Sequence, residues 1–196
     1  MPRRIDTDAR SLAIAGASLR VLERDGLAGL SVRGVADEAG IATASLRRAF
    51  PTQHSLREHC FSLIQQRASA RIRTLNLTGR ALAESILAQL LPLDGERRLE
   101  LVAQVQLGVL ALTDAALQPA AHRLSDAVDE GCQVAIAVLA GAGGLDPDRD
   151  PTYEARRLRA LLDGLAMSML WNAARSDGND ALVTLARHLD ELAPAA

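Results

Sequence analysis

Apolar side chains recur every three to four positions along most of this chain, which is the period of an amphipathic α-helix. The first such stretch covers residues 7–24 and ends at Asp25-Gly26. Ala and Leu dominate the composition, and both are strong helix formers. Alternating apolar and polar runs rich in β-branched residues, which would indicate strands, do not occur. The pattern therefore predicts an all-α fold.

Two short helices around a glycine follow within residues 31–50. Ser31 is a favourable N-cap, because its hydroxyl can accept a hydrogen bond from a backbone N–H of the first turn. Gly40 ends the first helix, since glycine adopts the left-handed conformation at little cost. The second helix, predicted over residues 43–49, turns Leu46 back onto the first. This pattern predicts a helix-turn-helix.

The outer face of the second short helix is polar and basic. It carries Thr43, Ala44, Ser45, Arg47 and Arg48. Such a helix is typical of one that enters the DNA major groove, but two short helices around a glycine also occur as purely structural pairs. The charge distribution favours DNA binding: residues 1–60 carry nine Arg and seven Asp or Glu, whereas the rest carry thirteen Arg and seventeen acidic residues. No lysine occurs, and arginine can bind phosphate or guanine with two hydrogen bonds.

Pro51-Thr52 interrupts the helical pattern and marks the expected functional boundary. We assign residues 1–52 to a DNA-binding domain and residues 53–196 to a helical effector-binding and dimerisation domain. A linking helix is predicted over residues 53–72. Further helices are predicted over residues 80–91, 96–112, 117–140, 152–174 and 180–192. The 96–112 helix is apolar almost all round and is expected to be central and buried, and residues 141–151 are expected to form a mobile loop.

Small residues predict a helix–helix contact near the C-terminus. Ala160, Gly164 and Ser168 follow one another at i, i+4 and i+8, which lets a second helix approach closely. The two last helices could pack only within one chain or meet their copies in a two-fold interface. A helix-turn-helix reader normally uses two half-sites, which favours a homodimer. The predicted interface residues are Leu161, Gly164, Leu165, Ser168, Leu182, Leu185 and Leu189.

Candidate ligand contacts lie on three of the later helices. Gln104 shares a face with apolar residues, so we expect it to be buried and to need a partner. Trp171 could line an apolar cavity, although Trp and Met at helical spacing are also typical of a core. A polar stripe from His122 through Ser125 and Asp129 to Cys132 is either a solvated face or a pocket wall. The predicted ligand set is Gln104, Gly108, Cys132, Met167 and Trp171.

Other kinds of chemistry are not expected. His54 and Glu58 lie one helical turn apart, but a third ligand on that face is missing, so we predict no metal site. The chain has no Ser-His-Asp pattern and no phosphate-cradling glycine loop, which argues against an enzyme and a bound cofactor. The chain has two cysteines without paired spacing, which indicates a reduced protein. It shows no apolar leader and no run approaching about 18 apolar residues, so we expect a cytoplasmic protein outside the membrane.

Residues 23–61 resemble the N-terminal domain of the TetR family of transcriptional regulators. The glycine after the first helix, the Ser-Val-Arg opening, the Ala-Gly-Ile turn and the closing Phe all match that domain. Residues 90–114 and 158–170 are similar to the ligand-binding domain of its BetI-like branch. The resemblance implies a homodimer on a palindromic double-stranded DNA operator and a small-molecule effector cavity among the C-terminal helices. Effector binding would then move the linking helix.

The resemblance also suggests which residues contact DNA. Thr43 and Ser45 would contact phosphate or base edges, and Ala44 would allow close approach and touch a thymine methyl group. Arg48 would supply a charge-assisted contact. The predicted set is Arg33, Thr43, Ala44, Ser45, Arg47, Arg48 and Gln53.

Three of these positions need separate comment. Arg33 would contact phosphate, with an ion pair to Asp37 or Glu38 as the alternative. Arg47 replaces the family's usual tyrosine, and its guanidinium can bind phosphate or read guanine O6 and N7. Gln53 replaces the usual lysine, so a donor stays at the helix N-terminus but the charge is lost. Ala42 stands where the family often has a capping serine, which makes Thr43 the candidate cap.

These observations predict a dimeric transcriptional regulator, a repressor released by an apolar or amphipathic effector. The alternative is a helical adaptor for protein partners without specific DNA binding. Loss of DNA binding with rising salt distinguishes the two. The resemblance does not establish choline as the effector, because a quaternary ammonium group usually needs an aromatic cage, and only Tyr153 and Trp171 are candidates.

Overall fold

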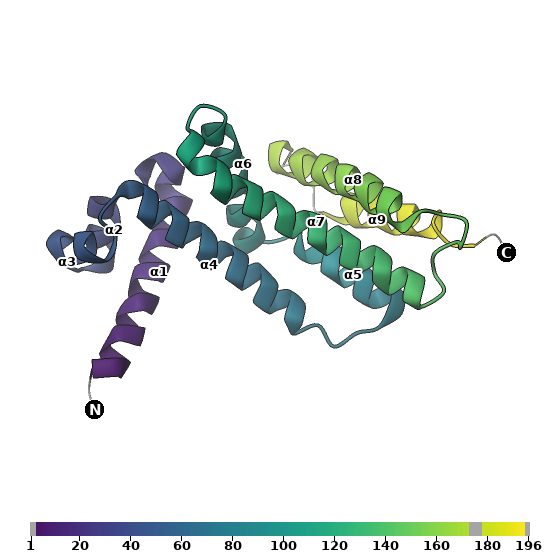
Figure 1. The fold of residues 1–196 in the computed structure, drawn as a ribbon, viewed down its shortest axis with the longest axis horizontal. Helices are drawn as coiled ribbons and strands as arrows, with labels where there is room; N and C mark the ends of the chain where they lie inside the picture. Colours follow the sequence, from purple (N-terminus) through teal and green to yellow (C-terminus); the bar gives the residue numbers. More distant parts are fainter. Residues whose placement is uncertain (1–2, 173–177, 195–196) are drawn as a thin grey trace. The chain divides into compact units, whose positions relative to one another are not determined.

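The computed structural model describes residues 3–172 and 178–194, and within them every regular element is helical (Figure 1), which confirms the predicted all-α fold. The chain forms two compact units. The first contains Met1–Gln66 and Val102–Ala121, and the second contains Arg67–Leu101 and His122–Ala196. The division predicted at residue 52 concerns function and stays a prediction. No helix of the described residues is long and apolar enough to cross a membrane.

The first unit begins with α1 (Arg3–Gly29), which is longer than the predicted 7–24. Gly26 interrupts its helical geometry with φ 66° and ψ −168°, so the expected break at Asp25-Gly26 is present although helix resumes beyond it. Helices α2 (Val32–Ala39) and α3 (Thr43–Ala49) have the predicted bounds. The three helices pack successively, α2 against α1 and α3 against α2.

Local interactions explain the ends of α2 and α3. The Ser31 Oγ accepts a hydrogen bond of 3.0 Å from the Gly34 backbone N–H, as the capping pattern predicts. Gly40 has φ 66° and ψ 30°, so the turn uses the left-handed conformation expected of glycine. The cap predicted for α3 is wrong: Ala42 occupies the N-cap position without a side-chain hydrogen bond, and Thr43 is the first helical residue.

Helix α4 (Gln53–Arg73) starts with a reciprocal cap. The Ser55 backbone N–H donates to Thr52 Oγ1 at 3.0 Å, and the Thr52 backbone N–H donates to Ser55 Oγ at 3.3 Å. The first unit also contains parts of α6 (Gly95–Ala111) and α7 (Gln118–Gly141), with the short 3₁₀ helix η1 (Ala115–Leu117) between them.

The expectation that α6 is buried all round is wrong. Only one face is fully buried, through Ala103, Leu107 and Ala111. Val109 is 61% exposed and Leu112, just after the helix, is 83% exposed. Apolar composition alone does not show which face has neighbours, and the face of α6 that carries Val109 lines an open pocket described below.

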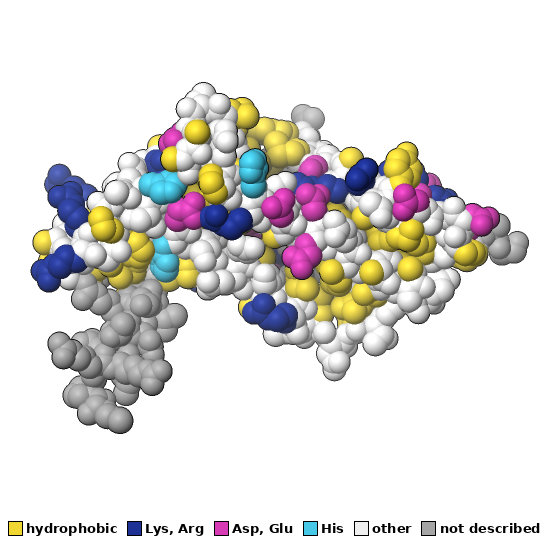
Figure 2. Space-filling model, in the orientation of Figure 1, with side chains coloured by type: hydrophobic (Ala, Val, Ile, Leu, Met, Phe, Trp, Pro, Cys, Tyr) yellow, Lys and Arg dark blue, Asp and Glu magenta, His cyan; other side chains and the backbone are white. Residues whose placement is uncertain are grey.

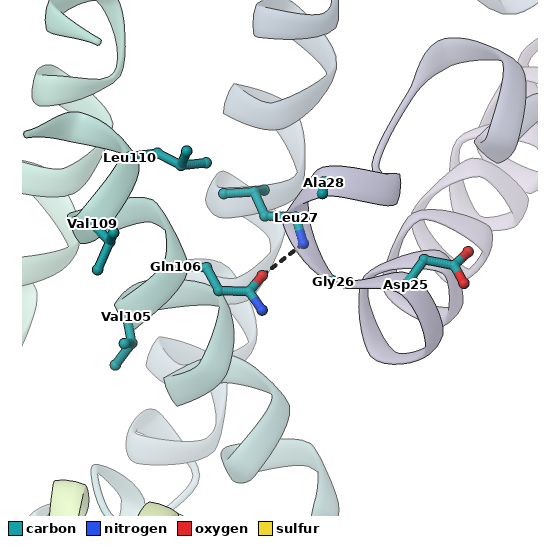
Figure 3. A pocket seen from close by; sticks show the side chains of 8 residues that line it. All are labelled: Asp25, Gly26, Leu27, Ala28, Val105, Gln106, Val109 and Leu110. Carbon is teal, nitrogen blue, oxygen red and sulfur yellow. Dashed lines mark hydrogen bonds between the residues drawn. The ribbon is translucent and has the colours of Figure 1, made fainter. Parts of the chain in front are cut away.

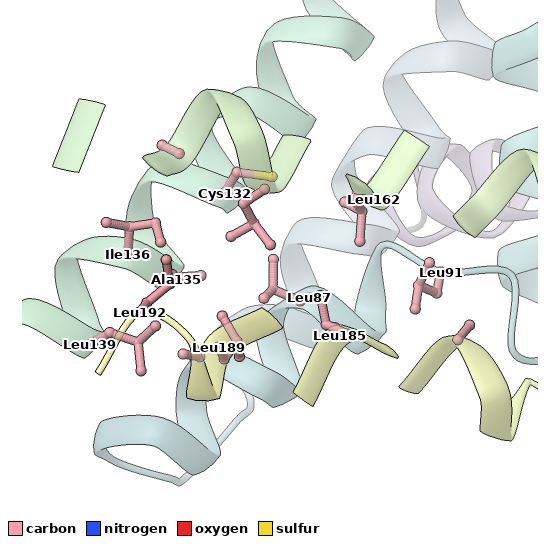
Figure 4. Close-up of a cluster of buried hydrophobic side chains, with 14 of the residues drawn as sticks. Leu87, Leu91, Cys132, Ala135, Ile136, Leu139, Leu162, Leu185, Leu189 and Leu192 are labelled. Carbon is pink, nitrogen blue, oxygen red and sulfur yellow. The ribbon is translucent and has the colours of Figure 1, made fainter. Parts of the chain in front are cut away.

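The second unit contains α5 (Gly79–Gln89), α8 (Pro151–Trp171) and α9 (Asn179–Asp190), with most of α7. Helix α9 packs against both α5 and α8. Side chains from these helices form one apolar core (Figure 4), in which Leu87, Leu158 and Leu189 are each fully buried. The predicted end of the α8 segment at residue 174 lies outside the described residues.

The connection from α7 to α8 is tied to the end of the chain. Leu145 is buried in the core, and the Asp146 backbone N–H donates to the Leu192 carbonyl at 2.8 Å. Arg149 Nη2 donates to the Glu191 carbonyl at 2.6 Å, while its Nη1 pairs with the buried Glu154 carboxylate at 2.9 Å. The loop predicted here is present, and these contacts fix it against α8 and the residues after α9.

Candidate functional site

Helix α3 presents a basic outer face. Leu46 is 0% exposed and packs inward, which fixes the rotation of the helix. Ala44, Arg47 and Arg48 are consequently exposed, with both arginines in the last turn. Dark-blue arginine side chains gather over the end of the first unit formed by α2 and α3 (Figure 2). Thr43 and Ser45 are half-buried on the flanks of this face.

Carboxylates do not neutralise this face. Glu38 of α2 accepts hydrogen bonds from Arg20 Nε at 2.6 Å and from Arg24 Nη1 at 2.8 Å, so it is occupied by α1. These two guanidinium groups hold the pKa of Glu38 below its usual value. Within the described residues, Arg47 and Arg48 have no ion-pair partner, so their charges stay available to an anion.

Arg33 lies on α2 with its side chain 86% exposed. Its Nε is 3.9 Å from Asp37 Oδ2, which is too long for a hydrogen bond, and the Asp37 carboxylate is itself mostly solvated. Exposed pairs of this kind contribute little to stability. The geometry therefore favours a guanidinium that can leave Asp37 for another anion, and Glu38, the other candidate partner, is held by α1.

Gln53 makes an intramolecular contact. Its Nε2 donates a hydrogen bond of 3.2 Å to the Leu30 carbonyl, which connects the start of α4 to the turn between α1 and α2. The carboxamide has two N–H groups, so one of them is left for a further acceptor. Its most direct role in the structure is to position α4 beside the helix-turn-helix.

Gly34 permits a close approach that the sequence did not reveal. A Cβ at this position would lie 3.2 Å from both the Gly29 carbonyl oxygen and Ser31 Oγ. A larger residue would therefore crowd the hydroxyl that caps α2. The glycine weakens the helix interior but leaves room for its cap.

The predicted ligand residues lie in different surroundings. Gln104 and Gly108 belong to the first unit and are half-buried. Met167 and Trp171 belong to the second unit, where Met167 is half-buried and Trp171 is 72% exposed. Cys132 is fully buried in the core of that unit, and burial raises the pKa of its thiol to about 12.

The polar stripe on α7 packs against α8 through one arginine. Arg159 Nη1 donates to the Ser125 carbonyl at 2.9 Å and pairs with Asp129 Oδ1 at 3.0 Å. His122, one turn before Ser125, is exposed. The stripe is thus solvated at one end and covered by Arg159 further along.

A pocket of about 330 Å³ occurs in the first unit, at a place that the sequence did not indicate (Figure 3). It lies between the end of α1 and helix α6. Gln106, not Gln104, points into it, and Gln106 Oε1 accepts a hydrogen bond of 2.6 Å from the Leu27 backbone N–H. The two glutamines lie two positions apart on α6 and therefore point to different faces of the helix. Which of them meets the pocket depends on where α1 packs, and the sequence of α6 does not show this. The lining residues are Asp25, Gly26, Leu27, Ala28, Val105, Gln106, Val109 and Leu110.

The predicted interface residues divide into surface and core. Gly164 and Ser168 are exposed, and a Cβ built on Gly164 meets nothing within 4 Å. Leu182 is also exposed, whereas Leu161 and Leu165 are partly buried against the core. Leu185 and Leu189 are fully buried within one chain, so their side chains have no surface to offer a second copy.

The histidine and carboxylate considered as metal ligands lie close to each other. His54 Nε2 lies 3.9 Å from Glu58 Oε1 on the first turns of α4. Among the residues that the structure describes, no group of three or more His, Cys, Asp or Glu side chains could hold a metal ion.

Comparison with known proteins connects this architecture to a family. Residues 79–194, more than half of the chain, match the family described as "BetI-type transcriptional repressor, C-terminal". The chain is 29% identical over 195 residues to the HTH-type transcriptional regulator PksA of Bacillus subtilis (strain 168), covering 98% of this chain and 94% of PksA.

Solved structures share the fold. A TetR transcription regulator from Haloarcula marismortui superposes with a TM-score of 0.80 at 21% identity, covering 94% of this chain and 98% of that one. A protein from Saccharomonospora viridis, described as a transcriptional regulator and crystallised in complex with choline, gives a TM-score of 0.75 at 21% identity over 94% of this chain and 96% of its own. From the sequence match and the helix-turn-helix together, the chain belongs to the TetR family of transcriptional regulators, with a C-terminal part of the BetI type.

Proposed function

We propose that this regulator binds a specific double-stranded DNA operator through α3. The observation that carries the proposal is the pair of exposed guanidinium groups, Arg47 and Arg48, on a short helix whose opposite face is fixed by the buried Leu46. Arginine can donate two hydrogen bonds to guanine O6 and N7 or bind phosphate. The exposed Ala44 leaves room for a base edge beside them.

Neighbouring residues would supply positioning contacts. Arg33 on α2 would exchange its loose contact with Asp37 for a DNA phosphate, and Thr43 and Ser45 would contact phosphate or base edges at the flanks of α3. Gln53 would use its remaining N–H for a phosphate oxygen at the start of α4. Phosphate contacts fix the register of a protein on DNA, whereas base contacts select the sequence.

The test is selection of DNA from a random duplex library, followed by anisotropy measurements on the enriched site. We expect Arg47→Ala and Arg48→Ala each to weaken binding about 5- to 150-fold, because a bidentate base contact contributes about 1–3 kcal/mol. Arg73→Ala is the matched control, since Arg73 is an exposed arginine in the last turn of α4 and belongs to the second unit. Binding by both variants at the parent's affinity would contradict the proposal.

Salt dependence separates the regulator from a protein-interaction adaptor. Neutralising DNA phosphates releases counterions, so the logarithm of the binding constant should fall linearly with the logarithm of the salt concentration. A mutation that removes one phosphate-binding side chain should reduce that slope by about one. If no duplex is enriched by the selection, the adaptor hypothesis replaces this one.

We further propose that two copies assemble through α8 and α9. The support is the exposed stripe of Ala160, Gly164 and Ser168 on α8 together with the exposed Leu182 on α9. The open space around Gly164 allows a second helix to approach closely. Leu161 and Leu165 would complete this face from its edges, and Leu185 and Leu189 would support it from within the core.

Light scattering after size exclusion tests the assembly. Gly164→Arg places a long charged side chain in the open space and should shift the protein from dimer to monomer. Gly141→Arg is the control, because Gly141 also has open space but lies at the end of α7. A dimer that persists in Gly164→Arg would overturn the proposed face.

We propose that a small apolar or amphipathic effector releases the operator, as expected for a repressor that binds the effector better in a DNA-incompetent state. A relative with this fold was crystallised with choline, which raises the question whether choline acts here. Tyr153 and Trp171 lie 18 positions apart on α8, hence about 27 Å apart at 1.5 Å per residue. They therefore do not form one aromatic cage within a chain.

The test of effector-driven release is the fraction of operator that stays bound as a candidate effector is added. Choline should leave the DNA complex unchanged at concentrations where an apolar effector dissociates it. Substitutions at Gln104, Gly108, Met167 and Trp171 are the first to examine for a changed effector concentration at half release. Cys132 belongs to the same set, although its full burial places it in the core rather than on an accessible wall.

A further inference from the structure

We propose that the pocket between the end of α1 and helix α6 is a binding site for a small uncharged molecule with an apolar body and one hydrogen-bond acceptor (Figure 3). None of its lining residues belongs to the ligand set predicted from sequence. The proposal concerns binding to the free protein, so it does not depend on the proposed DNA binding.

The walls of the pocket are apolar and already partly open to solvent. From α1 the pocket is lined by Leu27 and Ala28. From α6 it is lined by Val105, Val109 and Leu110. Val109 is 61% exposed, so its side chain is accessible to a ligand in this pocket. A volume of about 330 Å³ lies within the range of small-molecule sites.

Gln106 supplies the polar anchor. Its Oε1 is occupied by the Leu27 backbone N–H at 2.6 Å, which fixes the orientation of the carboxamide. The Nε2 group consequently lies on the side of Gly26, where a built Cβ would be 3.0 Å away. Within the described residues Nε2 donates no hydrogen bond, so it can donate to a carbonyl or hydroxyl oxygen of a ligand.

The backbone of Leu27 explains why this anchor exists. Gly26 departs from helical geometry, so the N–H of Leu27 needs a partner outside the helix. Gln106 of α6 provides it, and the Leu27 carbonyl accepts a hydrogen bond of 3.3 Å from Arg57 Nη2 of α4. The backbone of Leu27, which lines the pocket, is thus held by side chains of both α6 and α4.

Charge selects against ionic ligands. Asp25 is the charged residue of the lining, and its carboxylate is held by Arg24. Its Oδ2 accepts hydrogen bonds from Arg24 Nε at 3.1 Å and Nη2 at 2.9 Å, and its Oδ1 accepts one from Nε at 3.2 Å. That pairing offsets its charge, so a cation gains little there, and an anion would lose hydration at the apolar walls without a cationic partner. An uncharged ligand avoids both costs.

The probe for the test is 4-fluorobenzyl alcohol, followed by fluorine NMR on the full chain. We expect saturable binding and contacts between the probe's ring protons and the methyl groups of Val105, Val109 and Leu110. The cationic and anionic counterparts, 4-fluorobenzylamine and 4-fluorobenzoate, should bind at least about tenfold more weakly, because both would be desolvated without a partner.

Two substitutions locate the site. Ala28→Phe fills the pocket from an exposed position and should abolish probe binding, whereas Ala81→Phe on α5 is an equally exposed control that should not. Gln106→Met keeps the side-chain volume but removes both the donor and the acceptor that orients it toward the Leu27 N–H, and should weaken binding about three- to tenfold. Thermal unfolding of each variant confirms that it is folded.

The result that overturns the proposal is equally specific. Either an absence of saturable binding, or binding that is unchanged in Ala28→Phe, excludes this pocket as the site. Tighter binding of 4-fluorobenzylamine or 4-fluorobenzoate than of the alcohol would contradict the ligand class.

Discussion

The Glu38 carboxylate of α2 accepts a hydrogen bond of 2.6 Å from Arg20 Nε of α1. Arg24, one turn further along α1, donates to the other carboxylate oxygen at 2.8 Å. One acidic side chain thus fastens α2 to α1 and is removed from competition for Arg47 and Arg48. The electrostatics of the candidate DNA face therefore depend on a residue that does not lie on it.

Replacing Glu38 by Gln should make stability less dependent on acid. Because Arg20 and Arg24 lower the pKa of Glu38 in the folded protein, these ion pairs stabilise the protein above the unfolded-state pKa of about 4.3, and their contribution disappears as the pH falls through the lower folded-state pKa. We expect the melting temperature of Glu38→Gln to lie below the parent's at pH 6–7 and to approach it as the pH falls from the unfolded-state pKa through the lower folded-state pKa.

Glu23→Gln is the matched control, since Glu23 is an exposed residue of α1 without an ion-pair partner among the described residues. It should melt with the parent throughout this pH range. A difference between Glu38→Gln and the parent that grows as the pH falls would contradict the assigned role.

Gly40 should be the least replaceable residue of the turn. Its φ of 66° is strained for residues with a Cβ, although nothing lies within 4 Å of the position where that atom would be built. We expect Gly40→Ala to reduce the free energy of unfolding by about 1–2 kcal/mol. Gly40→Asn should cost less, because asparagine tolerates the left-handed region. Equal losses in urea denaturation would show that the backbone conformation is not the cause.

Leu46 should set the stability of the helix-turn-helix. Its side chain is 0% exposed, so Leu46→Ala removes buried apolar volume and should cost about 2–5 kcal/mol. Hydrogen exchange of amides in α2 and α3 measures this loss where it occurs. The exposed Val134 of α7 provides the comparison, and Val134→Ala should change exchange in α7 by less than about 0.5 kcal/mol.

Cys132 should be chemically inert in the folded protein. Burial raises the pKa of its thiol to about 12, so almost none of the nucleophilic thiolate is present at pH 7. In a Cys60→Ser background, iodoacetamide should alkylate Cys132 at least about a hundredfold more slowly in buffer than in urea. Cys132→Ser combined with Ala137→Cys, on the exposed side of α7, should react at similar rates in both.

Features that depend on neighbours in the chain were predictable. Ser31, Gly40 and the apolar spacing around Leu46 specify α2, the turn and α3 through local hydrogen bonds and backbone preferences, and the observed bounds of both helices match. The cap of α3 was not predictable, because Ala42 takes that position without any side-chain hydrogen bond.

Features that depend on distant partners were not predictable. Gln104 and Gln106 are both polar residues of an apolar helix, and only the presence of Leu27 beside α6 makes Gln106 the one that points into a pocket. In the same way, the periodic leucines of α9 show an apolar face, but whether that face meets its own core or a second chain is decided by α5 and α8. Leu185 and Leu189 meet their own core.

The arginine-only composition fixes how the charge of α3 can be regulated. A guanidinium stays protonated at every pH at which proteins fold, and it is not a substrate for lysine acetylation. Because the chain has no lysine, neither acidity nor that modification can switch off the cations at Arg47 and Arg48. In the unmodified chain, control over this face must then act on its position or its accessibility, because the charge of these two arginines does not change with pH.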